Sequence, residues 1–240
     1  MATGNGTGVS VTGGIGDNMV SGSSLSGTGA QLGNGAGVGT SGAVNGSSES
    51  GTGLVVAGSV NNQGALTGTS TSGTGADLLK VGSLTGSGSV IGTTRNGAQG
   101  LSVDGFVNGN TLSGTSASGT GLQVNNGATV QDATINGHTQ SGIGVSWGSA
   151  VDNQHVSVSG DADSGNGVFL NDGAILNNVT VKGKTLSGTG VFIAGNLTGG
   201  SVVGRAYGSG DAINLRGGYF PTRSSQALLV TEMGSWSLAQ

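Results

Sequence analysis

The sequence predicts an all-β fold, a single-stranded parallel β-helix in which three short strands make each coil. Three observations predict it. Glycine recurs at a nearly fixed interval, alternating apolar residues follow each recurring glycine, and no segment has apolar residues at helical spacing. Glycine costs backbone entropy on folding, so 54 Gly in 240 residues would otherwise indicate disorder. The period argues against that interpretation.

The period is counted at the second glycine of a Ser-Gly-Thr-Gly phrase, which stands for example at 50–53, 118–121 and 187–190 and recurs elsewhere, also in looser forms. The counted positions are Gly8, Gly29, Gly53, Gly75, Gly100, Gly121, Gly144, Gly167, Gly190 and, with alanine in place of glycine, Ala212. Neighbouring positions are 21 to 25 residues apart, with a mean close to 23. No unit of this length buries its apolar face alone, so the repeat indicates a solenoid of about ten coils.

The residues after each counted glycine have the pattern of a strand. The first and third are apolar in every unit, as in Leu54 and Val56, and the residue between them is mostly polar. This alternation is typical of a strand with one buried face. Two further short apolar pieces follow in each unit, for example at 174–176 and 179–181. Turns rich in Asn, Gly and Asp, which tolerate positive φ, join the three strands.

Stacking pairs each strand with its counterparts in the neighbouring coils, so ten coils at ~4.8 Å each would make a rod of ~48 Å. By analogy with parallel crossovers, we expect right-handed coiling. Other architectures fit less well, because a propeller blade needs about 40 residues and a sandwich would not repeat so evenly. The amyloid curlin repeat has a similar period, but its regularly placed Gln and Asn are not seen in this sequence.

The chain divides at about residue 216, where the period fails. We assign 1–216 to the β-helix domain and 217–240 to a C-terminal cap or linker. Residues 217–223 contain the only Pro and two adjacent aromatic residues, and 226–231 have the pattern of one more strand. A stack must cover its last apolar layer, which favours the cap. Because the repeat is already under way near residue 8, we interpret Met1 as the start of an excised fragment.

The composition argues against several classes of function. The net charge is −4, the pI is about 4.8 and no basic run occurs, so we expect no nucleic-acid partner. The chain has no Cys, which removes thiol catalysis and disulfides and is compatible with an oxidising exterior. No apolar run approaches the roughly 20 residues of a membrane-spanning helix, so we expect no membrane insertion in this segment.

A column of polar residues follows the glycine that closes each unit. Its members are Ser47, Thr69, Thr93, Thr115, His138, Asp161, Lys184 and Arg205. Thr115, His138 and Asp161 stand in the nucleophile, base and orienter order of a hydrolytic triad. The favoured interpretation is a solvated, structural ladder of charges (His138, Asp161, Lys184 and Arg205), because Ser and Thr fill such columns throughout and nothing marks an oxyanion hole. We therefore expect no catalytic residue.

The carboxylates do not form a cluster in the sequence pattern. Carbohydrate-cleaving β-helices need paired acids, or calcium-binding acids with a basic residue, on one face, and these acids scatter around the coil. Asp161 and Asp163 could hold Ca²⁺ weakly with Asn166, but a solvated turn is the favoured interpretation. Two His residues without Cys or clustered acids do not make a zinc site. We expect no metal site and no cofactor.

The aromatic residues give the one candidate binding patch. Phe169 and Phe192 occupy the middle, outward position of the first strand on adjacent coils, where they could form a contact surface. The favoured alternative is that the 217–240 segment folds over them. Trp147 falls at an inward position and is expected in the core. The Ser and Thr columns also suggest an ice-binding face, but unequal unit lengths and mixed residues argue against it.

The repeat as a whole resembles a known class of exported proteins. Units such as 164–181, which reads SGNGVFLNDGAILNNVTV, resemble the secreted passenger regions of type V secretion. These include filamentous-haemagglutinin-like exoproteins of two-partner systems and autotransporter adhesins of Gram-negative bacteria. The resemblance covers about 1–216. It implies a secreted or cell-surface rod that mediates adhesion or aggregation or spaces a distal effector. The implied partners are a host-cell or bacterial-surface protein or glycan, or a second copy.

Two functional hypotheses follow. The first is a structural or adhesive segment without enzymatic activity. The second is a polysaccharide-cleaving or polysaccharide-binding β-helix of the phage-tailspike kind. An outward acid pair in a groove of a trimer would favour the second hypothesis, and a featureless convex rod would favour the first.

Overall fold

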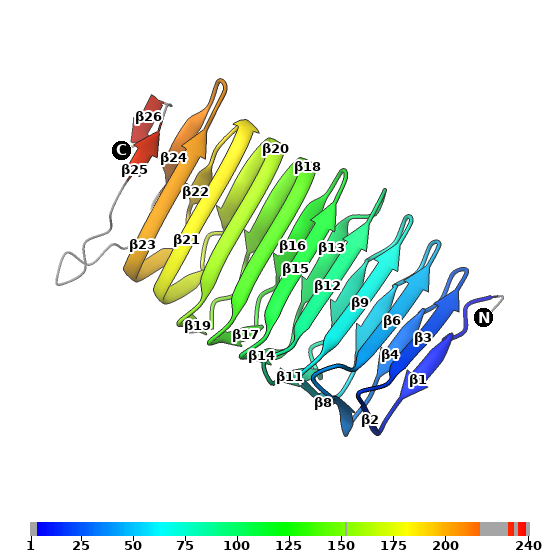
Figure 1. Ribbon diagram of the computed structural model, residues 1–240. Coiled ribbons are helices and arrows are strands. Elements are labelled where there is room, and N and C mark those ends of the chain that lie inside the picture. The colour runs from blue at the N-terminus through cyan, green and yellow to red at the C-terminus, as the bar shows by residue number, and fades with distance from the viewer. Residues whose placement is uncertain (1–3, 152, 217–229, 233–234, 239–240) are drawn as a thin grey trace.

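The computed structural model describes residues 4–151, 153–216, 230–232 and 235–238. In these residues the chain is an all-β parallel solenoid of about nine turns with ~23 residues per turn, as the sequence predicts (Figure 1). All ten predicted first strands form. One turn of the solenoid leads from each of these strands to the next, which gives nine turns. The described residues contain no helix that is long and apolar enough to cross a bilayer. Right-handed coiling stays a prediction.

Each turn contributes one strand to each of three sheets. The first sheet contains β1 (Val9–Val11), β4 (Ala30–Leu32), β7 (Leu54–Val56), β10 (Ala76–Leu78), β13 (Gln99–Val103), β16 (Thr120–Val124), the ends of β18 (Thr134–Trp147) and β20 (Ser157–Leu170), β22 (Val191–Ile193), β24 (Asp211–Leu215) and β26 (Ser235–Leu238). The second sheet contains β2 (Gly14–Gly16), β5 (Ala36–Val38), β8 (Ser59–Asn62), β11 (Ser83–Thr85), β14 (Phe106–Asn108), β17 (Thr129–Gln131), β19 (Asn153–Gln154) and the starts of β21 (Ile175–Ser187) and β23 (Asn196–Ala206). The third sheet contains β3 (Met19–Ser24), β6 (Ala43–Ser48), β9 (Ala65–Ser70), β12 (Ser89–Thr94), β15 (Thr111–Ser116), the starts of β18 and β20, the ends of β21 and β23, and β25 (Val230–Glu232).

The core is a stack of inward-facing apolar side chains that runs the length of the solenoid. Leu32, Leu54 and Leu176 are fully buried, and so is Trp147, which confirms its inward position. The indole N–H of Trp147 has no hydrogen-bond partner among the described residues. Burial of these alternating side chains, at about 25 cal/mol per Å² of apolar surface, is the main force that holds successive turns together.

Two columns of glycine interlock and bring the third sheet close to the start of the first. A Cβ atom added to Gly68, in β9, would lie 2.2 Å from the carbonyl oxygen of Gly75, which precedes β10. One added to Gly53, before β7, would lie 2.3 Å from the backbone nitrogen of Thr69. Backbone packs directly on backbone here, so any side chain would force the sheets apart. This contact explains why glycine recurs at the counted position of the repeat from Gly8 to Gly190.

The corner between the third and first sheets is closed by a buried hydroxyl group in the N-terminal turns. The Ser70 hydroxyl donates a hydrogen bond to the carbonyl oxygen of Gly51 in the preceding turn (2.8 Å) and accepts one from the backbone N–H of Gly73 (2.9 Å). The same pair of bonds occurs at four other turns, through Ser24, Ser48, Thr94 and Ser116. Buried backbone groups are thereby satisfied at each corner.

The turns between the second and third sheets contain a column of left-handed residues. Its non-glycine members are Asp132, His155 and Asn178, with φ of 49°, 54° and 51°. Asp, His and Asn are the residue types that best tolerate this region, as the predicted turn chemistry requires. His155 Nδ1 lies 3.4 Å from Asp132 Oδ1 on the neighbouring turn, and both side chains are exposed.

The C-terminal residues add two strands to the stack. β25 pairs with β23, and β26 pairs with β24. The strand expected at 226–231 is thus confirmed for Val230 and Thr231, and its other residues lie outside the described part of the chain. The cap or linker predicted for 217–240 lies mostly outside it as well.

Candidate functional site

The polar column predicted from the sequence lies on the outward face of the third sheet. Strand pairing places its members in register, turn by turn, from Ser47 to Arg205. We call this column the outer rank. It consists of Ser47, Thr69, Thr93, Thr115, His138, Asp161, Lys184 and Arg205, and the backbone register continues from Arg205 into β25. The buried glycine that precedes each member fixes its direction, because adjacent residues of a strand face opposite sides.

The charged end of the outer rank contains an ion pair. Lys184 Nζ donates to Asp161 Oδ2 at 2.8 Å, and both side chains are more than one-third exposed. The hydrogen bond and the charge of Asp161 raise the pKa of Lys184 above its ordinary value. Exposed pairs of this kind contribute about 0–1 kcal/mol to stability. The other two members of the predicted ladder, His138 and Arg205, lie in register on the neighbouring turns.

The triad order of Thr115, His138 and Asp161 does not become a bonded triad. The three residues occupy successive turns in register. Within the described part of the chain, no hydrogen bond joins Thr115 to His138 or His138 to Asp161, and the Asp161 carboxylate is bound to Lys184 instead. Nucleophilic catalysis requires a base within hydrogen-bonding reach of the nucleophile, so these side chains lack the arrangement as they stand.

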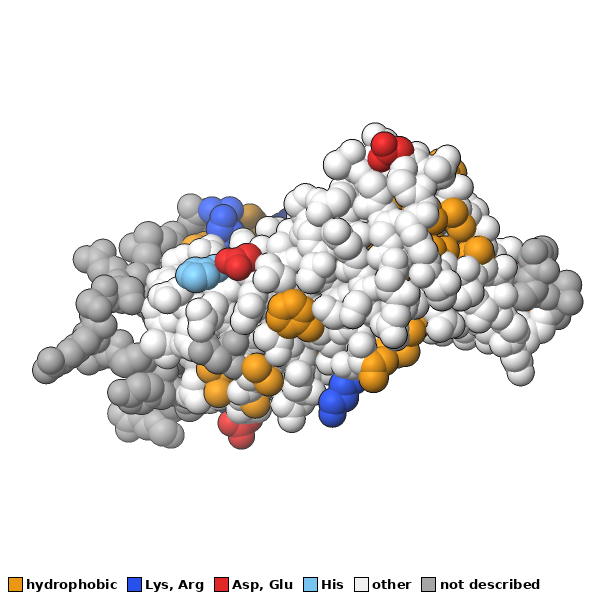
Figure 2. Space-filling view, turned by 90° about the horizontal axis from the view of Figure 1, so that it is seen from below, with side chains coloured by type: hydrophobic (Ala, Val, Ile, Leu, Met, Phe, Trp, Pro, Cys, Tyr) orange, Lys and Arg blue, Asp and Glu red, His pale blue; other side chains and the backbone are white. Residues whose placement is uncertain are grey.

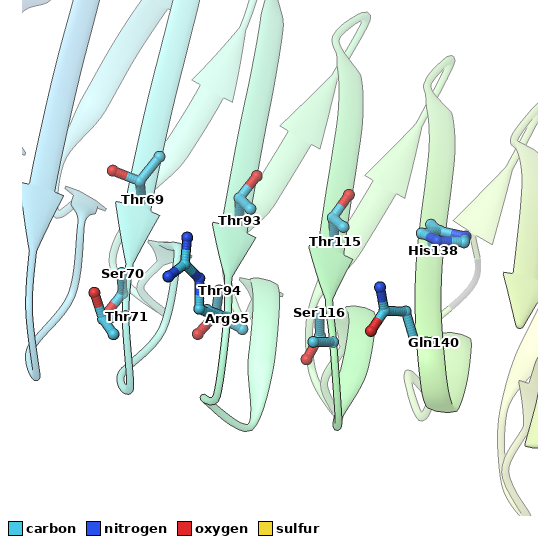
Figure 3. Close-up of a pocket in the computed structure, with 11 residues that line it drawn as sticks. Thr69, Ser70, Thr71, Thr93, Thr94, Arg95, Thr115, Ser116, His138 and Gln140 are labelled. Atoms are coloured by element: carbon cyan, nitrogen blue, oxygen red, sulfur yellow. The ribbon is translucent and has the colours of Figure 1, made fainter. Parts of the chain in front are cut away.

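A shallow trough of about 440 Å³ runs along the middle of the outer rank (Figure 3). One side consists of Thr69, Thr93, Thr115 and His138. The other side consists of the corner residues Thr71, Arg95, Ala117 and Gln140, one on each of the same four turns. The inward hydroxyl residues Ser70, Thr94 and Ser116 lie between the two sides. Figure 3 shows the guanidinium of Arg95 turned back toward the outer rank, between Thr69 and Thr93.

Two further hollows lie along the same sheet, on the side of the outer rank that faces away from the trough. One of about 360 Å³ lies over β3, β6 and β9 and is lined by Ser, Thr, Asn and Gly. The other, of about 340 Å³, lies over β20, β21 and β23 and is lined partly by Asp161, Lys182, Lys184 and Arg205. The third sheet therefore presents a row of three hollows along the axis, which we call the channel. The hollow nearest the N-terminus is lined by neutral residues, the middle one contains Arg95, and the one nearest the C-terminus is lined partly by charged residues and Val203.

The aromatic patch predicted from the sequence is a pair of stacked rings with a guanidinium over one of them. Phe169 and Phe192 are in register on adjacent turns, with ring centroids 4.7 Å apart and planes inclined by 11°. The Arg216 guanidinium lies over the Phe192 ring, 5.8 Å from its centroid. Both rings are half-buried. Since Phe192 has one face against Phe169 and a cation over its ring, the patch offers ring edges more than ring faces to a ligand.

Most of the 217–240 segment expected to cover this patch lies outside the described residues.

A carboxylate pair that the sequence pattern did not reveal lies on the outward face of the first sheet. Asp77 Oδ1 is buried and has no hydrogen-bond partner among the described residues. Burial, and then the charge of Asp104, raise the pKa of Asp77 to about 6, against a smaller lowering effect of the Ser102 hydroxyl. Asp104 itself accepts hydrogen bonds from Ser102 Oγ (3.1 Å) and Asn125 Nδ2 (3.0 Å).

This pair was missed because the two acids stand at different offsets from their glycines. The residue that follows a first-sheet strand lies beside the middle residue of the strand one turn earlier. Asn125 and Ser102 show the same relation, as do Asn171 and Ser146. This diagonal relation between neighbouring turns is the sequence signal from which the pair could have been predicted. Among the described residues no group of three His, Asp or Glu side chains could hold a metal ion.

Comparison with known proteins finds no match, whether against family models, curated proteins or solved structures. The functional conclusions below therefore rest on the geometry of this chain.

Proposed function

We propose that this chain is a structural and adhesive rod segment of a secreted or surface-displayed bacterial exoprotein, without enzymatic activity. The observation that carries the proposal is the unbroken strand pairing of the first sheet from β1 to β24. Each turn of such a stack needs only its neighbours, so turns can form one on another as a chain emerges outside a cell. A rod built in this way holds a distal group away from a surface.

The surface chemistry supports a role in contact rather than catalysis. On the face shown in Figure 2, charged side chains are few, and most of the surface is backbone or uncharged polar side chains. The acids and His138 form no hydrogen-bonded nucleophile and base in the described residues. The partners we propose are a host-cell or bacterial-surface protein or glycan, or a second copy of the chain.

The test uses beads coated with the whole chain. We expect them to adhere to bacterial or epithelial cells, or to one another, more than beads coated with an unrelated β-solenoid of equal charge. Equal adhesion would contradict the adhesive role. In parallel, the chain is incubated with bacterial polysaccharides. Steady sugar release that Asp161→Asn or Asp77→Asn abolishes would contradict the non-enzymatic role.

A second candidate function is polysaccharide binding of the tailspike kind, which the channel along the third sheet favours. Cleavage receives less support. Asp77 and Asp104 lie on the first sheet, away from this channel, and Asp161 is paired with Lys184. Glycan capture without turnover is compatible with the adhesive rod.

A further inference from the structure

We propose that the channel on the third sheet binds a linear acidic polysaccharide laid along the solenoid axis, with Arg95 as its principal anchor for an anionic group. The inference names the ligand of the adhesive function proposed above and rests on that function for its biological use.

The shape of the channel favours an extended ligand. The three hollows follow one another along the axis over the outward face of one sheet, from β3 to β23, with the middle one on the corner side of the outer rank and the other two on its opposite side. Each is shallow, whereas sites for small molecules enclose most of the ligand surface. Successive turns repeat every ~4.8 Å, so a polymer lying along the axis meets equivalent groups again and again.

The neutral lining suits sugar hydroxyl groups. Thr69, Thr93 and Thr115 offer hydroxyls that both donate and accept hydrogen bonds, and Gln140 adds an amide with both capacities. Among the described residues that line the three hollows none is aromatic, so stacked bases find no platform on them. A chain of hydroxyl-bearing rings matches this surface better than a nucleic acid does.

The charged residues of the channel favour an acidic polysaccharide as the ligand. The protein carries a net charge of −4, yet four of its seven Lys and Arg residues lie along this channel: Arg95, Lys182, Lys184 and Arg205. The Arg95 guanidinium is exposed beside the trough, and no carboxylate lines that trough. A guanidinium fork binds carboxylate in two parallel hydrogen bonds.

The spacing of the charges sets the kind of polymer. Arg95 and Lys184 are four turns apart, or about 19 Å along the axis. Asp161 lies between them and is paired with Lys184, so its charge is compensated there. The surface therefore fits an acidic glycan that carries an anionic group on each sugar, whose hydroxyls make most contacts and one of whose anionic groups meets Arg95.

The test measures the binding of oligogalacturonate to the whole chain by titration calorimetry at low and physiological salt. We expect Arg95→Gln to weaken binding about tenfold, since a hydrogen bond to a charged group is lost. The matched control is Lys80→Gln, which removes an equal charge at an exposed position away from the channel and should leave affinity within about twofold. Circular dichroism confirms that both variants fold.

Three probes decide the outcome. The uncharged oligogalactose of equal length and a polyglutamate of equal charge should each bind at least tenfold more weakly than oligogalacturonate. Equal binding of the neutral sugar, equal binding of polyglutamate, or equal effects of the two variants would overturn the inference.

Failure of the inference can be told apart from failure of the proposed function. If coated beads adhere to cells and oligogalacturonate does not compete, the adhesive rod stands and the ligand is wrong. If the chain binds the oligomer and cleaves it steadily, the channel stands and the non-enzymatic role is wrong.

Discussion

The N-terminal and C-terminal turns build the same solenoid with different corners. Up to β15, a buried hydroxyl both donates to the preceding turn and accepts from a glycine N–H three residues ahead. β18 and β20, of 14 residues each, run through this corner into the first sheet, whereas β21 ends at it with Ser187. Gly142, Gly165 and Gly188 take positive φ at these corners. Ala162 replaces the hydroxyl residue in one of these turns. A corner can therefore be held by a side chain or by glycine backbone.

The same two regions differ in their surfaces. The outer rank consists of Ser and Thr from Ser47 to Thr115 and contains charged residues from Asp161 onward. The aromatic stack of Phe169 and Phe192 belongs to the C-terminal turns as well. Register, glycine interlock and apolar core are shared by both regions. The comparison separates what the fold needs from what each surface adds.

Mutation of the glycine interlock, which both regions share, should give the largest loss of stability. Gly68→Ala and Gly137→Ala should each destabilise the chain by about 3 kcal/mol or more, because the new Cβ meets a backbone oxygen that cannot move independently. The control is Gly37→Ala, where the nearest atom would be 3.7 Å away. Urea unfolding measures all three. If Gly68→Ala costs no more than Gly37→Ala, the backbone contact is not real.

The next largest loss of stability should differ between the two kinds of corner. Thr94→Val leaves a buried carbonyl and a buried N–H without partners and should cost about 2 kcal/mol. Thr185→Val in the C-terminal region leaves only the Gly165 carbonyl and should cost about 1 kcal/mol. Both changes conserve shape, so unfolding free energies compare them directly. A larger loss at Thr185 would reverse our account of the corners.

A pH dependence should mark the N-terminal region. The folded pKa of Asp77, about 6, lies above its ordinary value of 3.8, so the protonated acid is favoured by folding. Its contribution to stability is complete below pH ~4, is lost as pH rises to ~6, and changes little above. After allowance for partial exposure, we expect a loss of about 1–2 kcal/mol.

Asp77→Asn should remove this loss and be more stable than the native chain at pH 7. Asp172→Asn, at an exposed position, should leave the profile unchanged. Chemical denaturation at pH 4 and pH 7 measures both. A native chain that is equally stable at the two pH values would disprove the burial effect.

The smallest effect concerns the C-terminal aromatic stack. Arg216→Gln should cost about 0.5–1 kcal/mol, because an exposed cation over Phe192 is lost. In a Phe192→Leu background the same change should cost nearly nothing. A double-mutant cycle measures the coupling, and additive effects would show that the guanidinium does not stabilise the ring.

The sequence was sufficient to predict the features that repeat from turn to turn along the solenoid axis. Period and alternation predicted the first strands, the outer rank from Ser47 to Arg205 and the stacking of Phe169 on Phe192, because in-register turns place equal offsets side by side. Contacts between residues at different positions within the turn could not be predicted in this way. The Asp77–Asp104 pair and the trough beside Arg95 depend on how corners fold over a sheet, which the period does not encode.

The continuous register of the stack is the central claim, and a distance series along the outer rank tests it most directly. The chain has no Cys, so Ser47→Cys can be spin-labelled together with either Asp161→Cys or Arg205→Cys. Five and seven turns separate these pairs, and double electron–electron resonance should give distances near 24 Å and 34 Å, a difference of about 10 Å. Equal distances, or a shorter one for the Arg205 pair, would contradict the continuous solenoid.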